Sequence, residues 1–190
     1  EASMGFLPGS DFSWIAHTER GWSVPHVIGY MESHDEERLM YRNLEFGKSY
    51  GNYDIRDLST ALFRVEMAAA FFFTIPGPKM IWQFGELGYD FSINYNGRLG
   101  NKPRRWYYYH TRHHIFEIFS TFIKLRMNEP AFRTEDVTLD LGGGFKRIAL
   151  NHEDMDVRVI GNFDVTTQSG TPAFSQTGTW YEFLSGESLE

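Results

Sequence analysis

The residues of this chain best suited to chemistry are a histidine and its neighbouring carboxylates, which stand directly after a short apolar segment. Residues 27–31 are largely apolar, and residues 32–38 then read Glu-Ser-His-Asp-Glu-Glu-Arg. A buried strand has this pattern where it emerges into a polar cleft, and in parallel α/β barrels the active site lies at the carboxyl ends of the strands. His34 and Asp35 are therefore the first candidates for a functional site.

The same cluster has two other interpretations. It could bind a divalent metal, since imidazole and carboxylate ligands suit zinc or manganese. Adjacent side chains at a strand end point to opposite sides, however, so His34 and Asp35 would not easily converge on one ion. The cluster could also be solvated charge without a function. We predict no metal site and no cofactor in this chain.

Three stretches resemble short conserved regions of the α-amylase family of glycoside hydrolases, glycoside hydrolase family 13. Ser33-His34-Asp35 is similar to the (Asn or Ser)-His-Asp that ends a strand in that family. Residues 75–88, IPGPKMIWQFGELG, resemble its "pGxPmiyyGdEiG" stretch on the last barrel strand. Residues 102–133, with KPRRW at the beginning and LRMNEPAF near the end, resemble the region of its final barrel helix. Together the matches cover roughly residues 22–133.

The resemblance implies roles for individual residues. Asp35 would stabilise the transition state by holding sugar hydroxyls at the cleavage subsite, and His34 would make a neighbouring hydroxyl contact. Glu86, at the end of the second predicted strand, and Tyr89 and Asn94, in the loop after it, are further candidates for substrate binding. The implied partner is an α-glucan oligosaccharide or polysaccharide. Calcium can accompany such enzymes, but these residues contain no evident site for it.

Two catalytic residues that the family uses have no counterpart here. The nucleophile is an Asp in a Gly-x-Arg-x-Asp stretch and the general acid/base is a Glu, both on earlier strands, and neither stretch is present. Residues 52–57 superficially resemble the first, but they follow Asp35 and lack the required order. The implied function is a fragment of a retaining hydrolase or transglycosylase, of α-amylase or branching-enzyme type, that is inactive alone. A non-catalytic carbohydrate-binding or scaffold piece is the alternative.

The length of the chain bounds the fold. It has 190 residues, whereas a complete (β/α)8 barrel needs roughly 250. We count two strand–helix units, within residues 27–73 and 79–127. The predicted fold is α/β plus all-β: residues 1–133 form the last two βα units of a TIM barrel, and residues 134–190 form an incomplete antiparallel β-sandwich domain. We expect a C-terminal piece of a larger enzyme.

Residue patterns place the individual elements. Apolar residues recur at steps of three and four in residues 57–73, which predicts a helix with Asp57 as its N-cap and Pro76 beyond its end. A second helix is predicted over residues 111–128, stopped by Pro130. Alternation between apolar and polar residues then predicts strands at 137–141, 145–150, 157–163 and 179–184. Residues 1–26 are predicted to be irregular because glycine and proline punctuate them.

Composition excludes several classes of partner. Lys and Arg number 18 against 25 Asp and Glu, and the net charge of -7 gives nucleic acid or an anionic membrane no reason to bind. Residues 104–114 mix basic and aromatic side chains, as single-strand binders do, but a helix entry explains this isolated run better. His110 and His114 stand four apart without the Glu of an H-E-x-x-H zinc motif. The chain has no cysteine and no apolar run of membrane-spanning length, and localisation is unreadable.

We also predict a homo-oligomer. Two barrel units without their neighbours would expose strand edges, together with the apolar side chains of Leu62, Phe72, Ile81 and Phe119. Soluble proteins hide such patches by association.

Overall fold

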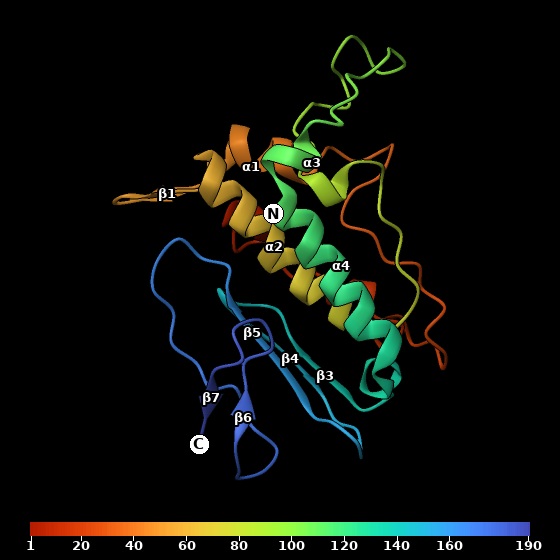
Figure 1. The fold of residues 1–190 in the computed structure, drawn as a ribbon, viewed down its shortest axis with the longest axis vertical. Helices are drawn as coiled ribbons and strands as arrows, with labels where there is room; N and C mark the ends of the chain where they lie inside the picture. The colour runs from red at the N-terminus through yellow and green to blue at the C-terminus, as the bar shows by residue number, and fades with distance from the viewer.

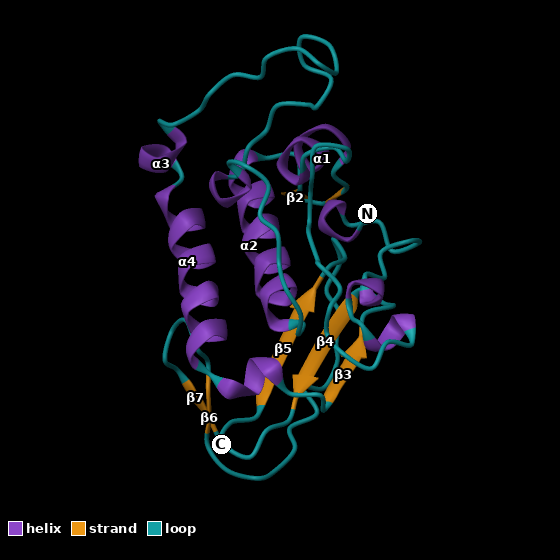
Figure 2. Ribbon diagram, turned by 90° about the vertical axis from the view of Figure 1, so that its right-hand side faces the viewer, coloured by secondary structure: helices purple, strands orange, loops and turns teal.

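The computed structural model describes residues 1–190, and its main layers are a pair of helices and a small sheet (Figure 1). Helices α2 (Leu58–Thr74) and α4 (His113–Asn128) lie side by side and run in the same direction. The sheet consists of β3 (Val137–Asp140), β4 (Phe145–Leu150) and β5 (Val157–Asn162), antiparallel in that order. Figure 2 shows the sheet beside the C-terminal end of α2.

Shorter elements join these layers. Helix α1 (Leu39–Phe46) and the hairpin of β1 (Ser49–Tyr50) and β2 (Tyr53–Asp54) precede α2. The four-residue helix α3 (Tyr108–Thr111) precedes α4, and β6 (Trp180–Tyr181) pairs with β7 (Ser188–Leu189) near the C-terminus. The first 26 residues are irregular apart from three single 3-10 turns, as predicted. The sequence patterns did not reveal α1 or the first hairpin.

Helix α2 forms where it was predicted because its apolar residues face two neighbours. One face packs in a core with α1 and α4 that includes Ala61, Leu62 and Phe72. The opposite face contributes Phe71 to a second core against the sheet. The helix ends before Pro76, which cannot donate a backbone hydrogen bond. Asp57 occupies the N-cap position as expected, but its side chain makes no capping hydrogen bond.

The two strands predicted for residues 27–31 and 79–84 are the main correction to the expected fold. They meet in a single parallel bridge between Gly29 and Lys79. The Gly29 N–H donates to the Pro78 carbonyl at 2.9 Å, and the Met80 N–H donates to the Gly29 carbonyl at 2.8 Å. Their adjacency and parallel direction match a βαβ unit, but one bridge does not make a sheet, because each segment has at most one paired neighbour.

The C-terminal sheet confirms three of the four predicted strands closely, and β6 lies within the fourth. The expected β-sandwich is not formed within these residues. The inner face of the three-stranded sheet packs on α2 and on the N-terminal segment through Phe71, Phe12 and Phe163, rather than on a second sheet. Strands β6 and β7 form a separate two-stranded sheet. The three-stranded sheet is therefore covered by a helix and not by these strands.

A homo-oligomer was predicted partly because four apolar side chains were expected to be exposed. That expectation was wrong for three of the four. Leu62, Phe72 and Phe119 are buried in the core between α1, α2 and α4, whereas Ile81 is 37% exposed. The homo-oligomer itself stays a prediction. No helix of this chain is both long and apolar enough to cross a membrane.

Close contact between β5 and α2 leads to a prediction about Gly161. A Cβ atom at this position would lie 2.8 Å from Cε2 of Phe71 and 3.3 Å from Sδ of Met67. Gly161→Ala should therefore separate sheet and helix and lower the free energy of unfolding by roughly 1–3 kcal/mol. Gly142→Ala is the control, since nothing lies within 4 Å of a Cβ there. Urea unfolding that ranks the two variants equally would contradict this account of the packing.

Candidate functional site

The segment after Gly29 leads into a tight turn that presents His34 and Asp35 to solvent. The Ser33 hydroxyl oxygen accepts hydrogen bonds from the backbone N–H groups of Asp35 at 3.0 Å and of Glu36 at 3.4 Å. This local bonding is typical of a serine that begins a turn. His34 Nε2 lies 3.3 Å from Asp35 Oδ2, and the two side chains are 70% and 68% exposed. An imidazole and a carboxylate thus stand side by side, free to contact a ligand.

A second loop, which follows the Gly85–Leu87 turn, reaches the same place. Arg98 donates from Nη2 to Asp35 Oδ1 at 3.0 Å and to the Asp35 carbonyl at 3.2 Å. Glu37 accepts hydrogen bonds from the Ser92 hydroxyl at 2.7 Å and from the Ile93 N–H at 2.8 Å. Lys102 holds the loop in shape by donating to its backbone carbonyls. The two loops therefore form one polar surface around Asp35.

One aromatic side chain, Trp82, borders this surface. The half-buried Trp82 ring lies 5.6 Å from the His34 ring, centroid to centroid, tilted by 49°. An indole beside an imidazole and a carboxylate combines a flat apolar face with hydrogen-bonding groups, which suits a sugar ring. Neither Trp82 nor Arg98 was predicted as a site residue. Trp82 belongs to the second motif, and that membership was the signal available in the sequence.

The other predicted site residues are placed differently. Glu86 is half-buried on the Gly85–Leu87 turn, and its charge raises the pKa of Glu32 as a minor contribution. Asn94 is exposed in the loop, where its backbone N–H donates to the Ser92 hydroxyl at 3.0 Å. Tyr89 is a correction, because it is only 2% exposed and its hydroxyl donates to the Pro103 carbonyl at 2.7 Å. A ligand at Asp35 cannot reach the Tyr89 ring in this arrangement.

Metal-ligating residues do not converge at this site. No group of three or more His, Cys, Asp or Glu side chains in the structure could hold an ion. His114, considered above as half of a zinc pair, lies with its Nε2 2.9 Å from Glu66 Oε1 instead. The polar surface around Asp35 can offer hydrogen bonds, charge and stacking from its own side chains.

A second polar cluster lies beyond the C-terminal end of α2 and includes Lys79, the residue that bridges to Gly29. Arg126 donates to the carbonyl oxygens of Ile75, at 3.0 Å, and of Gly77. Lys79 Nζ donates to the Gly77 carbonyl at 3.0 Å. Arg126 also donates to the carbonyl of Phe73 at 2.8 Å, so these side chains satisfy carbonyl groups at the end of the helix and just beyond it. Burial, followed by the charge of Arg126, lowers the pKa of Lys79 to about 7.

The lowered pKa of Lys79 predicts how stability changes with pH. The unfolded chain keeps the Lys79 proton up to about pH 10, whereas the folded chain releases it near pH 7. Since the unfolded state binds more protons in this window, the free energy of unfolding should rise between pH 7 and 10, by roughly 2–4 kcal/mol from this group. Lys79→Met should remove that rise. Lys124→Met, at an exposed position, should keep it, and equal pH profiles for the two variants in urea titrations would refute the assignment.

Comparison with known proteins identifies the fold. No family model matches this sequence, and no curated protein sequence matches it. Among solved structures, a cyclic α-maltosyl-(1→6)-maltose hydrolase from Arthrobacter globiformis, in complex with that sugar, superposes with a TM-score of 0.56 at 21% identity over 85% of this chain. The α-amylase from Geobacillus thermoleovorans, in complex with acarbose, gives a TM-score of 0.56 at 16% identity over 86%. The debranching enzyme of Nostoc punctiforme gives 0.53 at 17% identity over 85%.

This chain spans 35% of the length of each of these structures. At such identities the comparison shows shared fold, and it confirms at that level the resemblance to α-amylase family enzymes.

Proposed function

We propose that this chain, which shares its fold with one part of α-amylase family enzymes, contributes to the active site of a retaining enzyme that acts on α-glucans. The observation that carries the proposal is the exposed His34–Asp35 pair at the end of the segment that bridges to residue 79. Two motifs that resemble the family meet there in space, since Trp82 lies against His34. The enzyme would be a hydrolase or a transglycosylase, of α-amylase or branching-enzyme type.

In this proposal Asp35 stabilises the transition state. Its carboxylate accepts hydrogen bonds from sugar hydroxyls, and these strengthen as positive charge develops at the reacting carbon. His34 donates to a neighbouring hydroxyl, and Trp82 offers its face to the ring. Arg98 keeps the Asp35 carboxylate in place and borders the same hydroxyls.

The reaction itself needs two more carboxylates, about 5–5.5 Å apart, as nucleophile and as acid/base. We propose that they come from barrel strands that this chain does not contain. The single bridge between residues 29 and 79 supports this part of the proposal, because a closed barrel would pair both edges of each segment.

The sugar class follows from the neighbours as a proposal. Among the similar solved structures, the hydrolase from Arthrobacter globiformis is in complex with cyclic α-maltosyl-(1→6)-maltose or maltose, and the α-amylase from Geobacillus thermoleovorans is in complex with acarbose. We extend this to the present chain as an α-1,4-linked maltooligosaccharide that contacts the surface around Asp35.

Chemical-shift mapping with maltoheptaose tests the proposal on the chain as it exists. We expect weak binding, in the millimolar range, because one side of the site is absent. Shifts should concentrate at His34, Asp35 and Trp82, and Asp35→Asn should abolish them.

A matched control is available in the chain itself. His152 Nδ1 lies 3.6 Å from Asp154 Oδ2 in a second His–Asp pair, on the β4–β5 connection. Asp154→Asn should leave the maltoheptaose shifts unchanged. Shifts that follow Asp154, or that are absent around Asp35 at saturating sugar, would overturn the proposal.

A further inference from the structure

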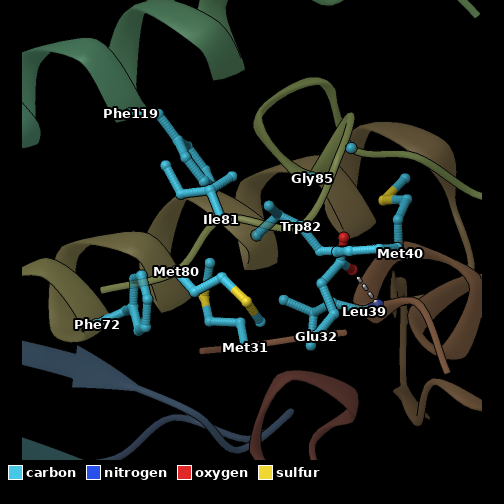
Figure 3. Close-up of a pocket in the computed structure, with 12 residues that line it drawn as sticks. Met31, Glu32, Leu39, Met40, Phe72, Met80, Ile81, Trp82, Gly85 and Phe119 are labelled. Carbon is cyan, nitrogen blue, oxygen red and sulfur yellow. Dashed lines mark hydrogen bonds between the residues drawn. The ribbon is translucent and has the colours of Figure 1, made fainter. Parts of the chain in front are cut away.

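Beneath the His34–Asp35 turn lies a buried ion pair whose two partners begin and end that turn. Arg38 Nη1 donates to Glu32 Oε1 at 2.7 Å, and both side chains are 8% exposed. The other carboxylate oxygen, Oε2, accepts the backbone N–H of Leu39 at 2.8 Å, the contact drawn in Figure 3. Glu32 thus closes a loop of seven residues at two points.

Residues in the second motif, residues 75–88, and directly after it contact this ion pair. The Arg38 guanidinium lies over the Tyr89 ring at 4.6 Å and near the Trp82 ring at 5.9 Å. Gly85 lies so close to Glu32 that a Cβ atom there would be 2.8 Å from Oε1. Figure 3 shows Glu32, Trp82 and Gly85 lining one small pocket. Tyr89, excluded above as a sugar contact, therefore supports Arg38.

Burial raises the pKa of the Glu32 carboxyl, and the charge of Arg38 and the hydrogen bond from Leu39 oppose that shift. A buried pair of this kind is costly to desolvate, and apolar side chains of similar size would fill the space at lower cost. Packing alone therefore does not account for it. What an apolar pair would not supply is the two hydrogen bonds that close the turn.

We propose that Glu32 and Arg38 are positioning residues, which set the direction of the Asp35 and His34 side chains toward the sugar. The inference rests on the proposed function for its purpose, but its geometry can be measured without sugar. Asp35 and His34 are exposed, so their directions follow from the backbone of the turn that Glu32 closes. Loss of either partner should leave the helices intact and let the turn move.

Nuclear magnetic resonance of the isolated chain tests this inference through two probes. The first is hydrogen exchange of the Leu39 amide, which the Glu32 carboxylate protects. The second is the chemical shift of the His34 ring protons, which the Trp82 ring current displaces while the two rings lie 5.6 Å apart. A side chain that only stabilises the core would not move the His34 signal in a chain that remains folded.

Arg38→Met should accelerate Leu39 exchange by about tenfold or more, since a hydrogen bond to a charged group is lost or weakened, and should shift His34 toward its unfolded value. Arg38→Lys should restore part of both signals. Arg42 lies four residues after Arg38 and forms an exposed ion pair with Glu1. Arg42→Met removes that pair and should change neither signal. Gly85→Ala should displace Glu32 from outside the turn and reproduce the effect with all charges present.

If Arg38→Met fails to fold, Glu32→Gln and Gly85→Ala carry the test, because each alters the pair with little change in volume. Folded variants with wild-type Leu39 exchange and wild-type His34 shifts would overturn the inference. The maltoheptaose mapping separates this inference from the proposed function. If the wild type binds at Asp35 but the variants keep the His34 geometry, only the positioning role is refuted. If the wild type does not bind, only the proposed function is refuted.

Discussion

Arg64→Leu should lower the free energy of unfolding by about 4 kcal/mol, the largest stability change that we expect from one substitution. Arg64 is 2% exposed on α2, and its guanidinium donates to backbone carbonyls on two other parts of the chain. The closest acceptors are Phe163 at 2.7 Å, Ala2 at 2.8 Å and Ser3 at 2.9 Å. Leucine would leave these buried carbonyls without a partner, and such losses lie at the upper end of single-site effects.

Urea unfolding of three variants separates this role from a general effect of removing an arginine. Arg64→Lys should recover less than half of the loss, because one ammonium group cannot reach acceptors arranged around a planar guanidinium. Arg104→Leu, at an exposed position, should cost less than about 0.5 kcal/mol. A loss below about 1 kcal/mol for Arg64→Leu would show that the N-terminal segment and β5 hold together without it.

Asp35→Asn should have the largest effect on catalysis. In the proposed enzyme, with the rest of its barrel present, the substitution should keep the shape of the site but remove a charge whose hydrogen bonds, in the proposed role, strengthen in the transition state. The turnover number should fall by about 100-fold, equivalent to about 3 kcal/mol, with a smaller change in KM. His34→Ala should cost less, since it removes a single contact to a neighbouring sugar hydroxyl. Steady-state kinetics with near-normal turnover for Asp35→Asn would remove Asp35 from the mechanism.

The elements that could be predicted from the sequence are those whose pattern is local. Helix α2 was recognisable because its apolar residues recur with helical spacing and Pro76 follows its end, and β3 to β5 because their residues alternate. The segments at 27–31 and 79–84 failed as strands, since a strand depends on partners, and a single bridge is formed. Helix α1 was missed because it is only eight residues long and Arg38, which makes no side-chain capping hydrogen bond, occupies its N-cap position.

The candidate site likewise combines residues that a local motif identifies with residues that only long-range contacts bring in. His34 and Asp35 could be found because they are neighbours in a recognisable motif, and the structure places them together at the surface. Arg98 could not, since it reaches Asp35 across 63 residues of sequence. Tyr89 was assigned to the substrate from its place in a loop, but burial against Arg38 depends on the three-dimensional packing. Sequence patterns identify candidate side chains, and only long-range contacts decide which of them face a ligand.

The central claim is that this chain supplies one part of a glucan site, Asp35 and its neighbours, without the nucleophile and the acid/base. It is tested most directly by incubating the purified chain with maltooligosaccharides and amylopectin, followed by reducing-end and branch-point assays. We predict no turnover above the blank without protein, because Asp35 is neither nucleophile nor acid/base in the proposed mechanism, and retaining hydrolysis needs both in a closed, water-excluding cleft. Turnover that is present in the wild-type chain and disappears in Asp35→Asn would show that the site is complete within these residues, and would contradict the account.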